Sequence, residues 1–184
     1  MGALLDSLNE ERPDELYNRS RDSLDWFRQN LRLIKVRSAS LLDELDPSVK
    51  SVELGKMYMF FYDAKTQDKL PYWDYFPLCI PIKKYNTGFM GLNLHYISPR
   101  VRLKLLDQMY SNVNEDAFGV NYRMVKSMGK LKWAKPCIKQ YLYGFFASYI
   151  KEVQPEYWDM VSMLPSTKFN TNANTVYAES MRKI

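Results

Sequence analysis

The chain has 184 residues, of which 46% are apolar and 15% aromatic, so it can form a domain with its own core and is not a disordered polypeptide. Its net charge is +5, and residues 51–184 carry 18 Lys and Arg against 11 Asp and Glu, which favours an acidic partner. No apolar run approaches the ~20 residues of a membrane span, so we expect no membrane partner, and the two cysteines are expected to be buried free thiols.

Residues 1–50 are predicted to form a long N-terminal helical arm. After Pro13, apolar residues recur every three or four positions, which is the spacing of a helix that presents one seam. A helix of about 30 residues would be about 45 Å long, more than the remaining domain needs to cover itself. Two interpretations stay open, an arm that reaches a neighbouring subunit and helices that pack on the chain's own sheet. The candidate partner-binding residues on the seam are Leu24, Phe27, Leu31 and Ile34.

Residues 51–184 are predicted to form a compact α+β domain, in which a small antiparallel sheet packs with helices. Strands are expected at 57–62, 78–82 and 89–96, and Pro81 indicates an edge strand or a bulge. The turn Asn86-Thr87-Gly88 would join the last two strands, with Gly88 at a positive φ. Helices are expected to start at Pro99, Pro136 and Pro155, and a further short strand at 149–153.

Seven basic residues and no acidic residue lie between positions 123 and 151. Such a stretch, with Trp133 inside it, resembles a strip that follows phosphates and stacks a base. It is also compatible with a solvated basic face or with contact to an acidic protein surface. The candidate partner-binding residues here are Lys126, Lys130, Lys132 and Lys135.

Residues typical of catalysis are scarce in the sequence. His95 is the only histidine, and strand alternation would place it on one face with Asn93, as a hydrogen-bonded structural residue. Asp63, Asp68 and Asp74 lie in a loop-rich stretch, but their spacing matches no calcium loop, so we expect solvated turn residues. The sequence therefore predicts no catalytic residue, no cofactor and no metal, and a protein that is not an enzyme.

Two blocks of sequence carry a family resemblance. A Tyr-Asp-x-Lys-Thr turn precedes Leu-Pro-Tyr-Trp-Asp-x-Phe-Pro within residues 62–77, and Gly-Phe-x-Gly-Leu-Asn-Leu-His-Tyr occupies residues 88–96. These blocks resemble small virion proteins of T4-like contractile-tailed bacteriophages. The resemblance covers about residues 56–180 and leaves the N-terminal segment outside. It implies a place in the tail, baseplate or neck of the virion, after synthesis in the host cytoplasm, and no catalytic residues.

Three hypotheses follow, in this order. The first is a structural assembly protein of the tail or baseplate, which contacts other virion proteins in multiple symmetric copies. The second is a neck protein associated with DNA ends, which binds nucleic acid through residues 123–151; DNA is a possible but not the favoured partner. The third is a nuclease that uses the three aspartates with a metal.

Overall fold

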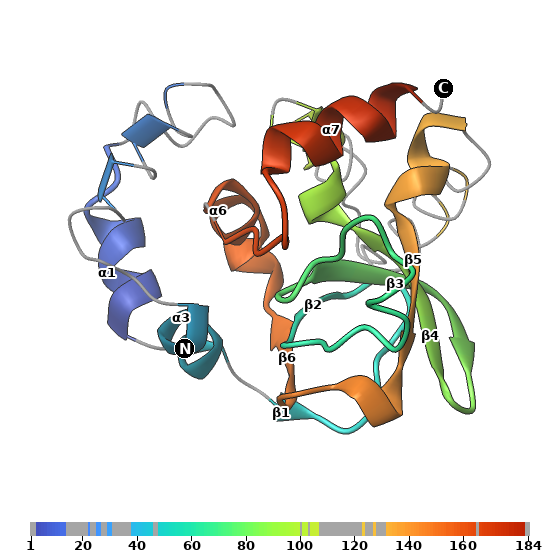
Figure 1. Cartoon of the computed structure of the whole chain (residues 1–184). Coiled ribbons are helices and arrows are strands. Elements are labelled where there is room, and N and C mark those ends of the chain that lie inside the picture. The colour runs from blue at the N-terminus through green and yellow to red at the C-terminus, as the bar shows by residue number, and fades with distance from the viewer. Residues whose placement is uncertain are drawn as a thin grey trace.

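A six-stranded antiparallel sheet dominates the part of the chain that the structure, a computed structural model, describes (Figure 1). The described residues are 3–13, 22, 25–26, 29–30, 38–45, 48–99, 101–102, 104–106, 123, 127, 132–164 and 166–182. The strands are β1 (Ser48–Val49), β2 (Met57–Met59), β3 (Leu78–Tyr85), β4 (Gly88–Asn93), β5 (Ile138–Leu142) and β6 (Ile150–Val153). Their order is β1-β6-β2-β3-β4-β5, and every neighbouring pair is antiparallel.

The helices whose full extent lies in the described residues are short. The α-helices are α1 (Ala3–Glu10), α3 (Ser38–Glu44), α6 (Trp158–Met163) and α7 (Ala173–Arg182). The 3₁₀ turns are η2 (Leu94–Tyr96), η3 (Lys132–Cys137), η4 (Tyr143–Phe145) and η5 (Pro155–Tyr157). The sheet is thus the larger element, and the predicted small sheet packed with helices understated it.

The predicted fold class, with its long N-terminal helical arm, is wrong. The described residues show no such arm: α1 spans Ala3–Glu10 and the next helix with full bounds, α3, spans only Ser38–Glu44. Leu8, Leu41 and Leu45 are instead buried in the cluster that contains the sheet residues, and Trp26 packs against the same cluster. The three-to-four spacing reports an apolar helical face but not what that face contacts. Leu24, Phe27, Leu31 and Ile34 lie outside the described residues, so their role in partner binding stays a prediction.

The sheet has two buried faces with different composition. One face, which we call the helix face, carries Met57, Met59 and Ile80 and packs with side chains of α6 and α7, in a cluster that residues of α3 also join. The other, the aromatic face, carries Tyr58, Phe60 and neighbouring rings, and loop residues cover it. Because successive side chains of a strand alternate between faces, the short apolar run of β2 supplies both cores.

Phe60 lies at the centre of the aromatic face. Its ring centroid is 5.2 Å from that of Tyr141 and 6.0 Å from that of Phe89, both in near-perpendicular edge contacts, and 4.5 Å from that of Phe146. Each such aromatic pair contributes about 0.5–1.5 kcal/mol beyond the area it buries. The loop between β2 and β3 is therefore anchored where its chain leaves the sheet.

The predicted hairpin between β3 and β4 is present, with Tyr85 opposite Gly88. The register shifts between Pro81 and Lys83, which confirms the bulge interpretation of Pro81, although β3 is an inner strand and not an edge. The strand at 149–153 and the helix after Pro155 are also confirmed. The helix predicted from Pro136 is wrong, since residues 138–142 form the edge strand β5.

The division of the chain near residue 50 stays a prediction. Ser48 and Val49 pair with Lys151 and Ile150 of β6, so the sheet itself begins just before that position. We expect residues 51–184 to retain sheet structure alone, measured by circular dichroism of the truncated protein. A truncated protein that shows no sheet signal would make residues 1–50 part of the folding unit.

Gly88 is needed for the close approach of β4 to β5 and not for a positive φ, which the structure gives to Gly55 (φ 86°). A Cβ at position 88 would lie 1.9 Å from the carbonyl oxygen of Tyr141. We therefore expect Gly88→Ala to lower the free energy of unfolding by about 1–3 kcal/mol, measured by urea denaturation. Gly144→Ala is the matched control, because its Cβ would meet nothing within 4 Å. Equal stability of the two variants would contradict the packing argument.

Candidate functional site

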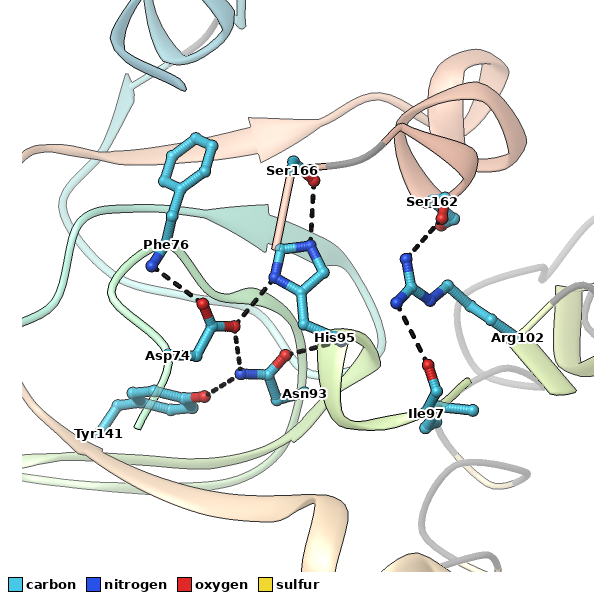
Figure 2. A network of polar contacts seen from close by, with 9 residues as sticks. All are labelled: Asp74, Phe76, Asn93, His95, Ile97, Arg102, Tyr141, Ser162 and Ser166. Atoms are coloured by element: carbon cyan, nitrogen blue, oxygen red, sulfur yellow. Dashed lines mark hydrogen bonds and ion pairs between the residues drawn. The ribbon is translucent and has the colours of Figure 1, made fainter. Parts of the chain in front are cut away.

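A buried carboxylate organises the polar centre of the molecule (Figure 2). Asp74 is only 4% exposed and accepts three hydrogen bonds. The main-chain N–H of Phe76 donates to Oδ1 at 3.1 Å, and Asn93 Nδ2 and His95 Nδ1 lie 2.9 Å from Oδ2. We call Asp74, Asn93, His95, Tyr141 and Ser166 the Asp74 network. It joins the β2–β3 loop, β4, η2, β5 and the segment after α6.

The protonation states of the network follow from its donors. Burial opposes the charge of Asp74, but the interaction with His95 and the hydrogen bonds from His95, Asn93 and Phe76 outweigh it and lower the pKa of the carboxyl. Burial also lowers the pKa of His95, which is fully enclosed, against the opposing effect of Asp74. A neutral imidazole that donates through Nδ1 to Asp74 and accepts through Nε2 from Ser166 Oγ at 3.0 Å satisfies every partner.

Sequence reasoning correctly paired Asn93 with His95 but missed their common partner. His95 lies in η2 and not in a strand, and the Asn93 side chain accepts from its main-chain N–H at 2.9 Å. Both side chains reach Asp74, which was expected to be a solvated turn residue. Those contacts join positions 19 and 21 residues apart, which no local pattern reports.

Ser166, His95 and Asp74 stand in the order hydroxyl, imidazole, carboxylate that serine hydrolases use. A nucleophile must also contact its substrate. Ser166 is 6% exposed, and neither it nor His95 lines the cavity bordered by Tyr96 and Tyr141 or the smaller one bordered by Tyr96 and Tyr177. The geometry therefore favours a structural network, in agreement with the structural interpretation of His95.

The three aspartates considered as metal ligands have different environments. Asp63 and Asp68 are exposed, whereas Asp74 is buried with its oxygens occupied by donors. Among the described residues no group of three or more His, Cys, Asp or Glu side chains is placed to hold a metal ion. Within the same residues, no helix has the length and apolar character needed to cross a membrane. Cys79 and Cys137 are buried free thiols, as predicted.

A cavity of about 310 Å³ opens beside the edge strand β5, next to the Asp74 network. We call it the tyrosine pocket. Its walls come from the β2–β3 loop, from η2 and from residues 139–142, and they carry five aromatic side chains: Tyr62, Tyr72, Trp73, Tyr96 and Tyr141. The tyrosines are buried, whereas Lys65, Thr66, Leu70 and Gln140 are exposed. The burial pattern gives the pocket an aromatic floor and a polar mouth.

The chemistry of the pocket combines rings, donors and positive charge. Lys139 Nζ lies 4.1 Å from the centroid of the Tyr96 ring, and Lys65 adds a second ammonium group to the lining. Burial raises the pKa values of Tyr62 and Tyr141, so their phenols stay protonated and can donate. The Trp73 indole N–H is buried without a hydrogen-bond acceptor among the described residues, which costs about 1–3 kcal/mol. Such walls suit a flat, anionic ligand.

The basic stretch 123–151 does not form one continuous strip. Lys139 lies on β5 and Lys151 on β6, with three strands between them. Of the candidate residues, Lys135 is exposed in η3 and the main chain of Lys132 opens that turn. Lys126, Lys130 and the side chain of Lys132 lie outside the described residues, so their role stays a prediction.

The family of the chain follows from comparison with known proteins. A family model described as the phage T4 terminal DNA protecting protein matches residues 5–183. The chain belongs to this family. The match confirms the resemblance to T4-like phage proteins, but it does not support a tail or baseplate role. The match begins at residue 5, so it includes the N-terminal segment that the resemblance left outside. Comparison with curated proteins gives no significant match, and neither does comparison with solved structures.

The buried histidine makes stability depend on pH. Because the pKa of His95 is lowered from its ordinary value of 6.5, the unfolded chain binds a proton that the folded chain excludes. This contribution is complete above about pH 6.5 and is lost as the pH falls toward the lowered folded value. We expect the free energy of unfolding to fall between pH 7 and 5, by up to about 1.4 kcal/mol per pH unit.

Urea denaturation at several pH values measures this slope. The parent is compared with His95→Gln, and since the chain has a single histidine, the substitution is expected to remove most of the slope in this range. An unchanged slope in a folded His95→Gln variant would show that another group controls the pH dependence.

Proposed function

We propose that the protein binds the ends of double-stranded DNA in the phage particle and shields them from nucleases that start at an end. The observation that carries this proposal is the family match over residues 5–183, since the family is described by the protection of terminal DNA. Protection requires that an end be occupied and not that a bond be broken. We therefore propose a binding protein and not an enzyme.

The charge of the chain supports a DNA partner. The net charge is +5, and DNA presents about one negative charge per 1.7 Å of helix axis, so association releases counterions. Lys65 and Lys135 are among the exposed lysines of the described residues, and Lys139 borders the tyrosine pocket. The sequence alone favoured protein partners over DNA. In this proposal DNA is the favoured partner. Contacts with other virion proteins in several copies are a secondary part of the proposal.

Nuclease protection tests the proposal directly. Linear duplex DNA with blunt ends is mixed with the purified protein and then with an exonuclease that degrades duplex DNA from its ends. We expect full-length DNA to persist, and unlabelled linear DNA to compete for the protein far better than the same sequence as a closed circle. Equal competition by the circle would contradict end binding and leave only general affinity for DNA.

Salt dependence tests the candidate lysines. We expect replacement of Lys126, Lys130, Lys132 and Lys135 by Gln to weaken DNA binding and to reduce the slope of log K against log salt by about 0.9 for each lysine that meets a phosphate. The matched control is Lys50→Gln, because Lys50 is exposed next to β1, at the opposite sheet edge from β5. Fluorescence anisotropy with labelled duplex at several salt concentrations gives both slopes. An unchanged slope in the fourfold variant would exclude these lysines from the DNA contact.

A further inference from the structure

We propose that the tyrosine pocket receives the terminal nucleotide of the DNA end, with its base on the aromatic floor and its phosphate at the mouth. This inference rests on the DNA-end binding proposed above and assigns that binding to one place in the fold. It accounts for three properties of the pocket: its size, its walls and the position of its charges.

The size of the pocket fits one nucleotide and excludes a duplex. Small-molecule sites measure about 300–1,000 Å³, and the pocket, at about 310 Å³, is at the lower limit of that range. A duplex, whose major groove alone is about 12 Å wide, cannot enter it. A single unpaired nucleotide is the part of a DNA end that can.

The walls suit a base without selecting among the four. Tyr72 and Tyr96 lie with their ring centroids 6.0 Å apart, and Trp73 adds a half-buried ring to the lining. Stacking on aromatic side chains tolerates every base, because each base has a π-face. A protein that protects ends needs this tolerance if the terminal sequence varies.

The charges place the phosphate at the mouth. Lys65 is exposed there, and Lys139 lies over the Tyr96 ring. The negative charge of Asp74 lies deeper, where Asn93, His95 and the main chain of Phe76 already donate to it. A phosphate would be attracted to the lysines and kept away from the carboxylate, so the nucleotide enters with its base first.

Such a pocket distinguishes an end from the interior of DNA. A terminal base stacks on one neighbour, whereas an interior base stacks on two. Extruding an interior base therefore breaks one more stacking contact, which lowers the equilibrium constant for extrusion about tenfold. Extrusion is least costly for a base that is already unpaired. The phosphate charge is the same in both places, so the lysines alone would not make this distinction.

The test is a double-mutant cycle between the protein and the DNA. A blunt duplex is compared with the same duplex whose terminal nucleotide is abasic, each with parent protein and with Trp73→Ala. We expect either change alone to weaken binding about ten- to a hundredfold, and both together to cause little further loss, because they remove the same stack. Trp73→Phe keeps a ring and is expected to restore most of the affinity.

A second pair of variants leaves the aromatic side chains of the pocket intact. Leu70 lines the pocket and is 39% exposed, so its replacement does not disturb the core. Leu70→Glu places a carboxylate at the mouth and is expected to weaken end binding at least tenfold, whereas Leu70→Gln, of the same size, is not. Thermal unfolding of each variant establishes that it is folded.

The outcomes separate this inference from the proposed function. If the parent binds hairpin-closed duplex as well as blunt duplex, end binding itself fails. Suppose that the parent protein prefers blunt ends, but that Leu70→Glu binds blunt duplex as tightly as the parent does and the parent binds the abasic duplex as tightly as the blunt one. End binding then stands, and the pocket is not its site. Additive losses from Trp73→Ala and the abasic terminus would also overturn the pocket assignment.

Discussion

The carboxylate of Asp74 is buried, and this constraint fixes the centre of the structure. An ionised group with 4% exposure needs donors from the protein, and Asp74 receives them from its own loop, from β4 and from η2. Removing one donor to a buried polar group costs about 1–3 kcal/mol, and more where the group is charged, because the acceptor is left unsatisfied. The β2–β3 loop is therefore held in one position against the sheet, despite its length and its polar tip.

The same side chains connect this constraint to the candidate site. Asp74 and Tyr141 belong to the network and also line the tyrosine pocket, and Tyr141 Oη accepts from Asn93 Nδ2 at 2.9 Å. On the loop side, the Trp73 main chain donates to Asn170 Oδ1 at 2.8 Å. A pocket whose floor and wall are fixed before binding loses less conformational entropy when a ligand arrives. In the proposed mode of binding, the network therefore contributes by holding these walls in place.

Local signals in the sequence predicted local structure and no more. The β3–β4 hairpin, the bulge at Pro81 and the helix after Pro155 follow from turn residues and proline geometry within a few positions. The strand β5 was mistaken for a helix because Ile138 and Leu142 are four residues apart, a spacing that fits a helix, while its pairing partner lies in β4. The Asp74 network and the pocket depend on contacts between distant segments, so no periodicity in one segment could indicate them. The motif block 62–77 was the useful signal, since it contains Asp74 of the network and the pocket residues Tyr62, Tyr72 and Trp73.

End recognition needs more than positive charge. Phosphates repeat along the whole duplex, so attraction to them brings the protein to DNA but gives no preference for its termini. Only at a terminus does a base have a stacking neighbour on one side and none on the other, so that it can leave the stack easily. A shallow basic surface cannot detect this, whereas a half-open aromatic pocket bordered by lysines can, because it is filled only by a nucleotide that is free to enter. We therefore propose two separate contributions. Dispersed lysines determine the affinity for DNA and its dependence on salt, and one rigid pocket determines the preference for an end.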